Sequence, residues 1–144
     1  ELETLFSQKM EEKGLQFGIE LDSKIPTSLL MDEVRIRQVL INLIGNAVDA
    51  ISDVSPDERM VWVEGVCQDS HVCVVIRDSG GGMSDVDLEK VFEPFFTTKA
   101  EGKGTGLGGS ISYGIVTSFG GTIRADNWEK GAEFTLVFPA MEAS

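Results

Sequence analysis

The longest periodic segment of the chain, residues 32–51, reads DEVRIRQVLINLIGNAVDAI. Its apolar residues recur at steps of three and four, which places them along one side of an α-helix. They are Ile36, Leu40, Leu43, Ile44, Ala47 and Ile51. Asp32 precedes the periodic run and can accept a hydrogen bond from the first free N–H groups of a helix. The segment therefore predicts a long helix from Asp32 to about Ile51, with one side in the core.

A row of polar side chains follows another side of the same helix. Because one turn takes 3.6 residues, spacings of three and four put these groups in a single line. The row consists of Arg35, Gln38, Asn42, Asn46 and Asp49. Asn is a mediocre helix former, so two of them in register call for a reason. Taken alone, the row is explained equally well as a solvated face.

The remaining segments alternate between strand and helix patterns. They predict a strand at 15–21, a hairpin of strands 60–66 and 72–77 with His71 in its turn at 68–71, a helix capped by Ser84 and running through Val91, a helix at 110–119, and closing strands at 122–125 and 133–138. This order is typical of an α+β fold, a two-layer α/β sandwich with helices on one face of a mixed, mostly antiparallel sheet.

Composition narrows the class of protein. A chain of 144 residues with 42% hydrophobic content suits one compact domain. The net charge of -12 argues against an extended nucleic-acid surface. The chain contains neither an apolar run long enough to span a bilayer nor a signal-peptide pattern. It begins at Glu1, so we expect an excised fragment.

The two cysteines and the single histidine carry no strong signal. Cys67 and Cys73 lie in apolar strand-like runs, which favours small buried thiols in a reducing compartment. Their spacing gives no support for a disulfide across the hairpin. His71 is expected to be an ordinary surface residue.

Asp78 ends the second predicted strand of the hairpin, and Gly80 and Gly82 follow it. A carboxylate at a strand end, beside glycines that allow close approach to the backbone, can accept from an exocyclic amine. Adenine offers that donor and the O6 of guanine does not, so such a site would select ATP over GTP. An Asp-Gly turn that merely closes the hairpin is the more common interpretation of this pattern.

A glycine-rich segment, residues 100–109, leads directly into the helix predicted at 110–119. Free N–H groups at a helix start can meet phosphate oxygens, although such segments are often only connectors. The segment lacks the closing Gly-Lys-Ser/Thr of a Walker loop and does not follow a strand in a βαβ unit. Mg²⁺ prefers oxygen ligands and is often coordinated by substrate phosphates as well as by the protein. An Asn carbonyl can supply one such ligand.

In this order and spacing the motifs resemble those of the GHKL superfamily, which includes gyrase, heat-shock chaperone ATPases, histidine kinases and mismatch-repair ATPases. The resemblance covers residues 30–139. The N box is similar to residues 42–47, the first glycine box to 78–82, the F box to 92–96, and the second glycine box, in the mobile ATP lid, to 104–108. Residues 96–99 and 110–116 are similar to the nitrogen-regulation and dicarboxylate-sensor branch of the sensor histidine kinases.

The resemblance implies a fold of the Bergerat type and a role for each matching residue. Asn46 would ligate Mg²⁺, with Asn42 near the phosphates. Asp78 would bind the adenine amine in a pocket shaped by Gly80 and Gly82. The lid residues that would close over the triphosphate are Gly104, Thr105, Gly106, Leu107 and Gly108, with Lys99 and Lys103 as phosphate-side charges. Thr135 would reach adenine through a water molecule.

Two positions depart from the pattern of this superfamily. Many members carry Lys or Arg three residues after the second Asn, where this chain has Asp49. Gly109 stands where a second Leu of the lid is expected. Glycine there loses an apolar contact and adds backbone freedom at a helix start, which predicts a less ordered lid.

The function implied is that of a histidine kinase catalytic domain, which binds ATP and Mg²⁺ and donates the γ-phosphate to a histidine. ATPase relatives carry Glu one turn before the metal-binding Asn, to activate water; here that residue is Asn42, whose amide is no base. The acceptor histidine would lie on an absent dimerisation domain, and a response regulator would act downstream. A GHKL ATPase of the chaperone or repair type and a degenerate nucleotide sensor remain alternatives.

The expected organisation follows from the same resemblance. Residues 1–14 would be the remnant of an upstream dimerisation helix or a linker, residues 15–140 the catalytic ATP-binding domain, and residues 141–144 a tail. The domain would be cytoplasmic and part of an inner-membrane receptor, without itself touching the membrane.

Overall fold

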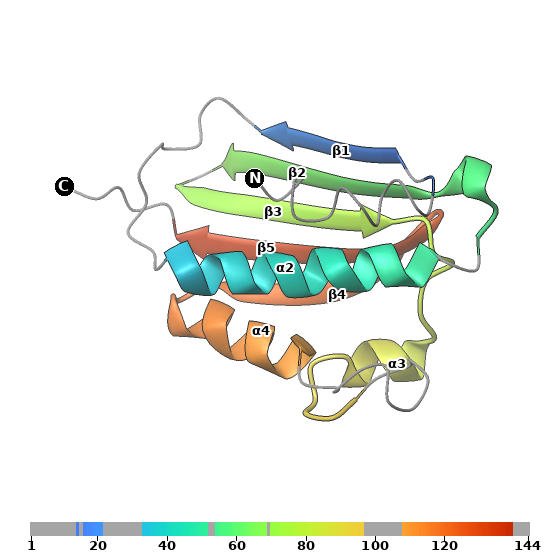
Figure 1. Cartoon of the computed structure of the whole chain (residues 1–144). Helices are drawn as coiled ribbons and strands as arrows, with labels where there is room; N and C mark the ends of the chain where they lie inside the picture. The colour runs from blue at the N-terminus through green and yellow to red at the C-terminus, as the bar shows by residue number, and fades with distance from the viewer. Residues whose placement is uncertain are drawn as a thin grey trace.

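The computed structural model describes residues 14, 16–21, 33–51, 54–68, 70–96 and 108–139 of the chain. Within these ranges it has two layers, a sheet and a set of helices that cover one face of it (Figure 1). The strands are β1 (Gln16–Leu21), β2 (Met60–Gln68), β3 (His71–Asp78), β4 (Thr122–Trp128) and β5 (Gly131–Pro139). The helices are α2 (Glu33–Ala50), α3 (Asp85–Lys90) and α4 (Gly108–Ser118), with a short 3-10 helix at Pro56–Glu58.

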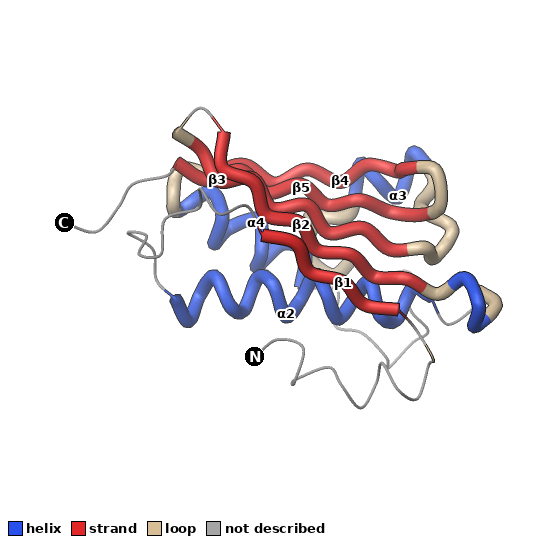
Figure 2. The backbone as a smooth tube through the Cα atoms, turned by 90° about the horizontal axis from the view of Figure 1, so that it is seen from above, coloured by secondary structure: helices blue, strands red, loops and turns tan. Residues whose placement is uncertain are grey.

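The sheet confirms the predicted mixed, mostly antiparallel arrangement. Its five described strands lie in the order β1-β2-β3-β5-β4. β1 is parallel to β2, and the other three pairs are antiparallel. Figure 2, the view from above, shows α2 and α4 on one face of the sheet, and no helix of the described residues covers the other face.

Both hairpins are tighter than the sequence predicts. Gln68 pairs with His71, so His71 is the first residue of β3 and not part of the turn. A two-residue connection of this kind favours a positive φ, and Ser70 has a φ of 63°. Trp128 likewise pairs with Gly131, which extends both closing strands beyond the predicted 122–125 and 133–138. Asp126 and Asn127 are weak strand formers, and pairing with β5 overrides that preference.

Helix α2 supplies one wall of the core. The predicted stripe is confirmed, and Val39 and Val48 join it as fully buried side chains. The stripe is wider than one row of contacts requires because α2 packs on both the sheet and α4. Opposite it, the core is lined by alternate residues of the strands, among them Val61, Ile76, Phe134 and Leu136.

The two shorter helices begin and end close to where the sequence predicts. The Ser84 Oγ accepts from the Asp87 N–H at 3.1 Å and caps α3. Helix α4 begins at Gly108, two residues earlier than predicted. It ends in a glycine turn, in which Gly120 has a φ of 76° and the Gly121 N–H donates to the Val116 carbonyl at 3.1 Å. The predicted N-cap of α2, Asp32, lies outside the described residues.

Neither Cys67 nor Cys73 forms a disulfide, and both residues are half-buried. Cys67 pairs across the hairpin with Val72, and Cys73 pairs with Val66, so the two thiols do not face each other. Burial raises the pKa of the Cys73 thiol. In the part of the chain that is described, no helix combines the length and the apolar character needed to cross a membrane.

We predict that Leu43→Ala lowers the free energy of unfolding by about 2–5 kcal/mol, because it leaves a cavity where α2 meets the sheet. Leu43 is 1% exposed, whereas Ile111 on α4 is 40% exposed. The control Ile111→Ala should change that free energy by about 0.5 kcal/mol or less. Urea unfolding of both variants measures the difference. Equal losses in the two would contradict the placement of this core.

Candidate nucleotide-binding site

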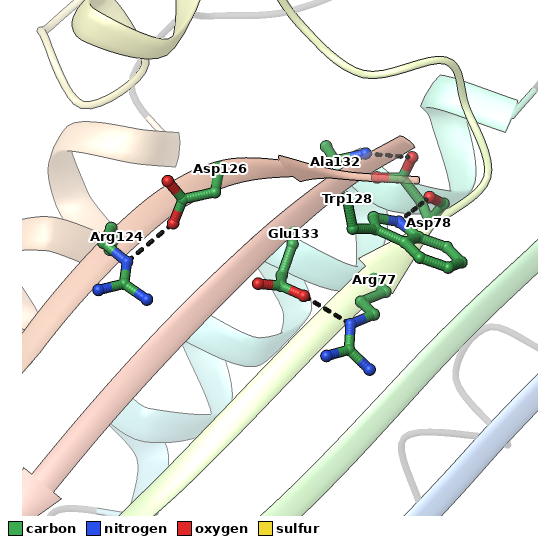
Figure 3. Close-up of polar contacts among 7 residues, drawn as sticks. All are labelled: Arg77, Asp78, Arg124, Asp126, Trp128, Ala132 and Glu133. Atoms are coloured by element: carbon green, nitrogen blue, oxygen red, sulfur yellow. Dashed lines mark hydrogen bonds and ion pairs between the residues drawn. The ribbon is translucent and has the colours of Figure 1, made fainter. Parts of the chain in front are cut away.

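Asp78 is a buried carboxylate at the carboxyl end of β3. The residue is 3% exposed. Its Oδ1 accepts from the Gly80 N–H at 2.8 Å. The same oxygen accepts from the Ala132 N–H at 3.5 Å (Figure 3). Burial raises the pKa of Asp78, and these two backbone hydrogen bonds act in the opposite direction. The bond to Gly80 is the one that a simple Asp-Gly turn makes, but a turn alone does not require a buried charge.

The glycines after Asp78 are explained by close packing. A Cβ at Gly80 would lie 2.7 Å from the carbonyl oxygen of Ala50, the last residue of α2. Gly82 has a φ of 79°, and a Cβ there would lie 2.6 Å from the Asn127 Oδ1. Larger residues at either position would push this segment away from the helix or from β4. The glycines thus bring the backbone after Asp78 against the end of α2.

Asn42 and Asn46 do not form a solvated face, since both are half-buried, whereas Arg35 and Gln38 are exposed. The Asn42 Nδ2 donates to the Ser112 Oγ of α4 at 3.4 Å. A Cβ added at Gly108, the first residue of α4, would lie 3.9 Å from the Asn42 side chain. Asn42 therefore lies where α2 meets the start of α4.

One side of α2 connects these features. Asn42, Asn46 and Ala50 follow one another at steps of four residues, so they lie in one row along the helix. The row begins at the start of α4 and ends at Gly80, beside Asp78. At 1.5 Å per residue it is about 12 Å long. The structure thus brings Asp78, Gly80, Asn46, Asn42 and Gly108 together along one helix.

Thr135 does not join this group. It alternates along β5 with Phe134 and Leu136, whose side chains are buried in the core. Its ladder partners are Val75 and Arg124, so its side chain lies on the face of the sheet without helices. The implied contact of Thr135 with adenine is not supported, because the period of two in a strand turns it away from Asp78.

The predicted lid residues lie outside the described residues. They are Lys99, Lys103, Gly104, Thr105, Gly106 and Leu107, and their roles stay predictions. Elsewhere in the described ranges, no three His, Cys, Asp or Glu side chains lie close enough to hold a metal ion between them.

The interpretation of Gly109 as a lost apolar contact is wrong. A Cβ at Gly109 would overlap the Val91 carbonyl oxygen, because the start of α4 lies directly against the end of α3. The F-box residue Phe92 completes this junction, with ring centroids 5.7 Å from Tyr113 and 6.2 Å from Phe134. Glycine at 109 therefore permits the close packing of α3 and α4.

Three residues that no sequence motif marks also touch this site. Ser112 is fully buried and accepts from Asn42. Asn127 and Trp128 at the end of β4 bond to the segment that follows β3. An Asn near the end of a strand is unusual enough to have been a signal, but its partners are distant in the sequence.

We predict that Asp78→Asn raises the free energy of unfolding of the ligand-free domain near neutral pH. A carboxyl group whose pKa is raised on folding contributes stability that is complete below its unfolded value of 3.8 and is lost as the pH rises through the folded-state pKa. Asn keeps the Oδ1 acceptor and removes the buried charge. Urea unfolding across pH, with the exposed Asp126→Asn as control, should show that the gain in the free energy of unfolding of Asp78→Asn becomes smaller as the pH falls. A gain independent of pH would contradict this account.

We predict that Gly109→Leu destabilises the domain by about 1–3 kcal/mol, because the side chain must displace the backbone at Val91. Gly114 in the same helix is exposed, and a Cβ added there would meet nothing within 4 Å. Gly114→Ala should therefore stabilise by about 0.5–1 kcal/mol. Thermal unfolding of both variants compares them, and a stabilising Gly109→Leu would refute the close approach of α3 and α4.

Comparison with known proteins agrees with this geometry. Residues 31–142 match the family described as histidine kinase-, DNA gyrase B- and HSP90-like ATPases. The two-component sensor PprA of Pseudomonas aeruginosa is 42% identical over 86% of this chain and 14% of its own length. The C4-dicarboxylate transport sensor DctB of the same organism is 39% identical over 79% of this chain and 19% of its own. The chain thus spans less than a fifth of either relative.

Solved structures show the same fold. The nucleotide-free catalytic domain of histidine kinase ThkA is 33% identical, with a TM-score of 0.84 over 96% of this chain and 88% of that domain. Full-length ShkA in complex with AMPPNP is 30% identical, with a TM-score of 0.83 over 98% of this chain and 29% of its own. The chain therefore belongs to the family of histidine kinase-, DNA gyrase B- and HSP90-like ATPases, and within that ATP-binding family it is a histidine kinase catalytic domain.

Proposed function

We propose that this domain binds ATP with Mg²⁺ between Asp78 and the start of α4, and donates the γ-phosphate to a histidine on a dimerisation domain of the same protein. The observation that carries the proposal is the buried Asp78 carboxylate, which is oriented by backbone N–H groups at one end of the row Asn42–Asn46–Ala50. A buried charge that raises the cost of folding calls for a compensating use.

Asp78 recognises the base through its second oxygen. Among the described residues, both hydrogen bonds to the carboxylate go to Oδ1, so we assign Oδ2 to the exocyclic amine of adenine. Guanine would present its O6 there, and two acceptors would face each other without a proton between them. Asp78 therefore selects ATP over GTP by leaving a buried polar group unsatisfied when the wrong base enters.

The opposite end of the row receives the phosphates. The side chain of Asn46 carries a neutral carbonyl oxygen, which suits Mg²⁺ shared with a polyphosphate. Asn42 holds α4 through Ser112 and places Gly108, the last residue of the predicted lid, beside α2. When bound, Mg²⁺ supplies charge neutralisation at the transferred phosphoryl group. The lid residues Lys99, Gly104, Thr105, Gly106 and Leu107 would add backbone and lysine contacts.

Transfer rather than hydrolysis follows from the chemistry of Asn42. Its amide is a donor to Ser112 and cannot take a proton from water near neutral pH. Phosphoryl transfer needs mainly positioning and charge stabilisation, and the nucleophile would come with the acceptor histidine. His71 lies exposed at the start of β3, far along the strand from Asp78, and is not that acceptor.

We also propose a response regulator as the partner downstream of the phosphorylated histidine. Support comes from the relative ThkA, which has been crystallised with the response regulator protein TrrA and is 30% identical to this chain. The sensor proteins among its relatives favour a cytoplasmic domain of an inner-membrane receptor, where ATP is available. Residues 15–140 would form the catalytic unit.

Calorimetric titration with a non-hydrolysable ATP analogue tests this function. We expect binding that Mg²⁺ strengthens, that GTP analogues do not reproduce, and that Asp78→Asn weakens about 100-fold, because its amide nitrogen would face the adenine amine. Asp126→Asn, on an exposed ion pair, should bind as wild type does. Absence of binding in the wild type would overturn the proposal.

Transfer is tested with the dimerisation segment supplied as a separate chain and labelled ATP. Acid-labile phosphate on that segment, with slow phosphate release in its absence, supports the kinase function. Rapid release by the domain alone would favour a chaperone-type or repair-type ATPase. Binding without transfer would favour a nucleotide sensor.

A further inference from the structure

Ser79 is bonded to Met60 of β2, but the rest of the segment between Asp78 and Met83 has little of its own to hold it in place. Gly80, Gly81 and Gly82 follow one another, and the last two have φ values of 89° and 79°. Glycines lose more backbone freedom on ordering than any other residue. The direction of the Asp78 carboxylate, which the proposed ATP site requires, must therefore be imposed by neighbouring elements.

Asn127 holds the far end of this segment from the helix face of the sheet. Its Oδ1 accepts from the Met83 N–H at 2.9 Å, and its Nδ2 donates to the Met83 carbonyl at 2.7 Å. The side-chain amide thereby satisfies both main-chain groups of Met83, as a neighbouring strand would. A side chain at Gly82 would collide with the same Oδ1, so the fit depends on both residues.

Trp128 holds the near end from the opposite face. Successive residues of a strand point to opposite sides, so the Trp128 indole lies on the face without helices. Its Nε1–H donates to the Asp78 main-chain carbonyl at 2.8 Å (Figure 3). The Arg77 guanidinium lies 5.9 Å from the indole centroid and is itself paired with Glu133. The indole is therefore fixed by a cation–π contact while it holds Asp78.

The turn between β4 and β5 completes the contact. The Gly81 N–H donates to the Lys130 carbonyl at 3.3 Å, and the Ala132 N–H reaches the Asp78 Oδ1 at 3.5 Å. A Cβ at Gly131 would overlap the Asp78 carbonyl oxygen, so only glycine allows the hairpin to approach this closely. The residues from Asn127 to Ala132 thus contact both ends and the middle of the glycine segment.

We propose that Asn127 and Trp128 are positioning residues for nucleotide recognition, which hold the Asp78–Met83 segment from opposite faces of the sheet and so determine the preference for adenine. This inference rests on the proposed function. Hydrogen bonds weaken steeply as their angle departs from linearity. If the backbone at Asp78 were less constrained, the carboxylate would turn and lose its hydrogen bond from the adenine amine. Neither residue needs to contact the nucleotide, because its loss would change the base selectivity through the position of Asp78.

The test compares ADP with inosine diphosphate, which differs at the base by replacing the amine with a carbonyl. Titrations use wild type, Trp128→Phe, Asn127→Ala and the control Asp126→Asn. Trp128→Phe keeps a ring over Arg77 and removes the N–H donor, and Asp126 lies beside both residues in an exposed ion pair. We expect each of the two variants to bind ADP about tenfold more weakly, with inosine diphosphate little changed. Asp126→Asn should keep the wild-type ratio.

A merely structural role would lower the melting temperature and weaken both nucleotides equally, which would overturn the inference. An unchanged ratio of the ADP and inosine diphosphate affinities in both variants would also overturn it. If Asp78→Asn still bound ADP more weakly, the proposed function would remain intact. A wild type without preference for ADP would count against the proposed function itself. Amide exchange at Gly80, Gly81 and Gly82 in the ligand-free protein is an independent readout. It should accelerate about tenfold in Trp128→Phe and Asn127→Ala, and unaltered exchange would refute the inference.

Discussion

The packing of α2 across the sheet is the contact on which the rest of the molecule depends. One side of this helix buries Val39, Leu43, Ile44 and Val48 against the strands, and this burial supplies much of the apolar contact that holds two layers together. An adjacent side carries Asn42, Asn46 and Ala50 from the start of α4 to Gly80. A helix is rigid along its axis, so the core contacts also set the distance between the two ends of the proposed ATP site. Stability and recognition are therefore linked through a single element.

The buried carboxylate of Asp78 shows what recognition costs this fold. Its pKa is raised by burial, so the charged form is less favourable in the folded domain than in water. Two backbone N–H groups compensate only in part, because both meet the same oxygen. The fold tolerates this loss at the edge of a core that is otherwise apolar. A ligand that donates to the remaining oxygen would recover some of the lost solvation, which gives adenine an advantage over bases without a donor there.

The junction of α3 and α4 also explains how the domain accommodates Gly109, where the superfamily pattern has a leucine. Gly109 has no side chain where a leucine is expected, yet the space is filled by the Val91 carbonyl. The start of α4 and the end of α3 lie so close that backbone meets backbone, and Phe92 and Tyr113 pack beside the junction. Packed interiors leave few voids, so a smaller residue is matched by a closer approach of its neighbours.

The local sequence determined the helices, most of the strands and the N-cap Ser84, because helical period and strand alternation are properties of short segments. Motif spacing is also local, and it singled out Asp78, Asn42 and Asn46 as candidate site residues. The tertiary structure alone decided which residues meet. It placed Thr135 on the face of the sheet that is turned away from Asp78, and it made His71 the first residue of β3, paired with Gln68. It also brought Asn127 and Trp128 to a segment more than forty residues away in the sequence. It also showed that the packing of α3 against α4 requires glycine at position 109. Such contacts depend on strand register and on the approach of separate elements, and no local pattern encodes the distance between two segments that are far apart in the chain.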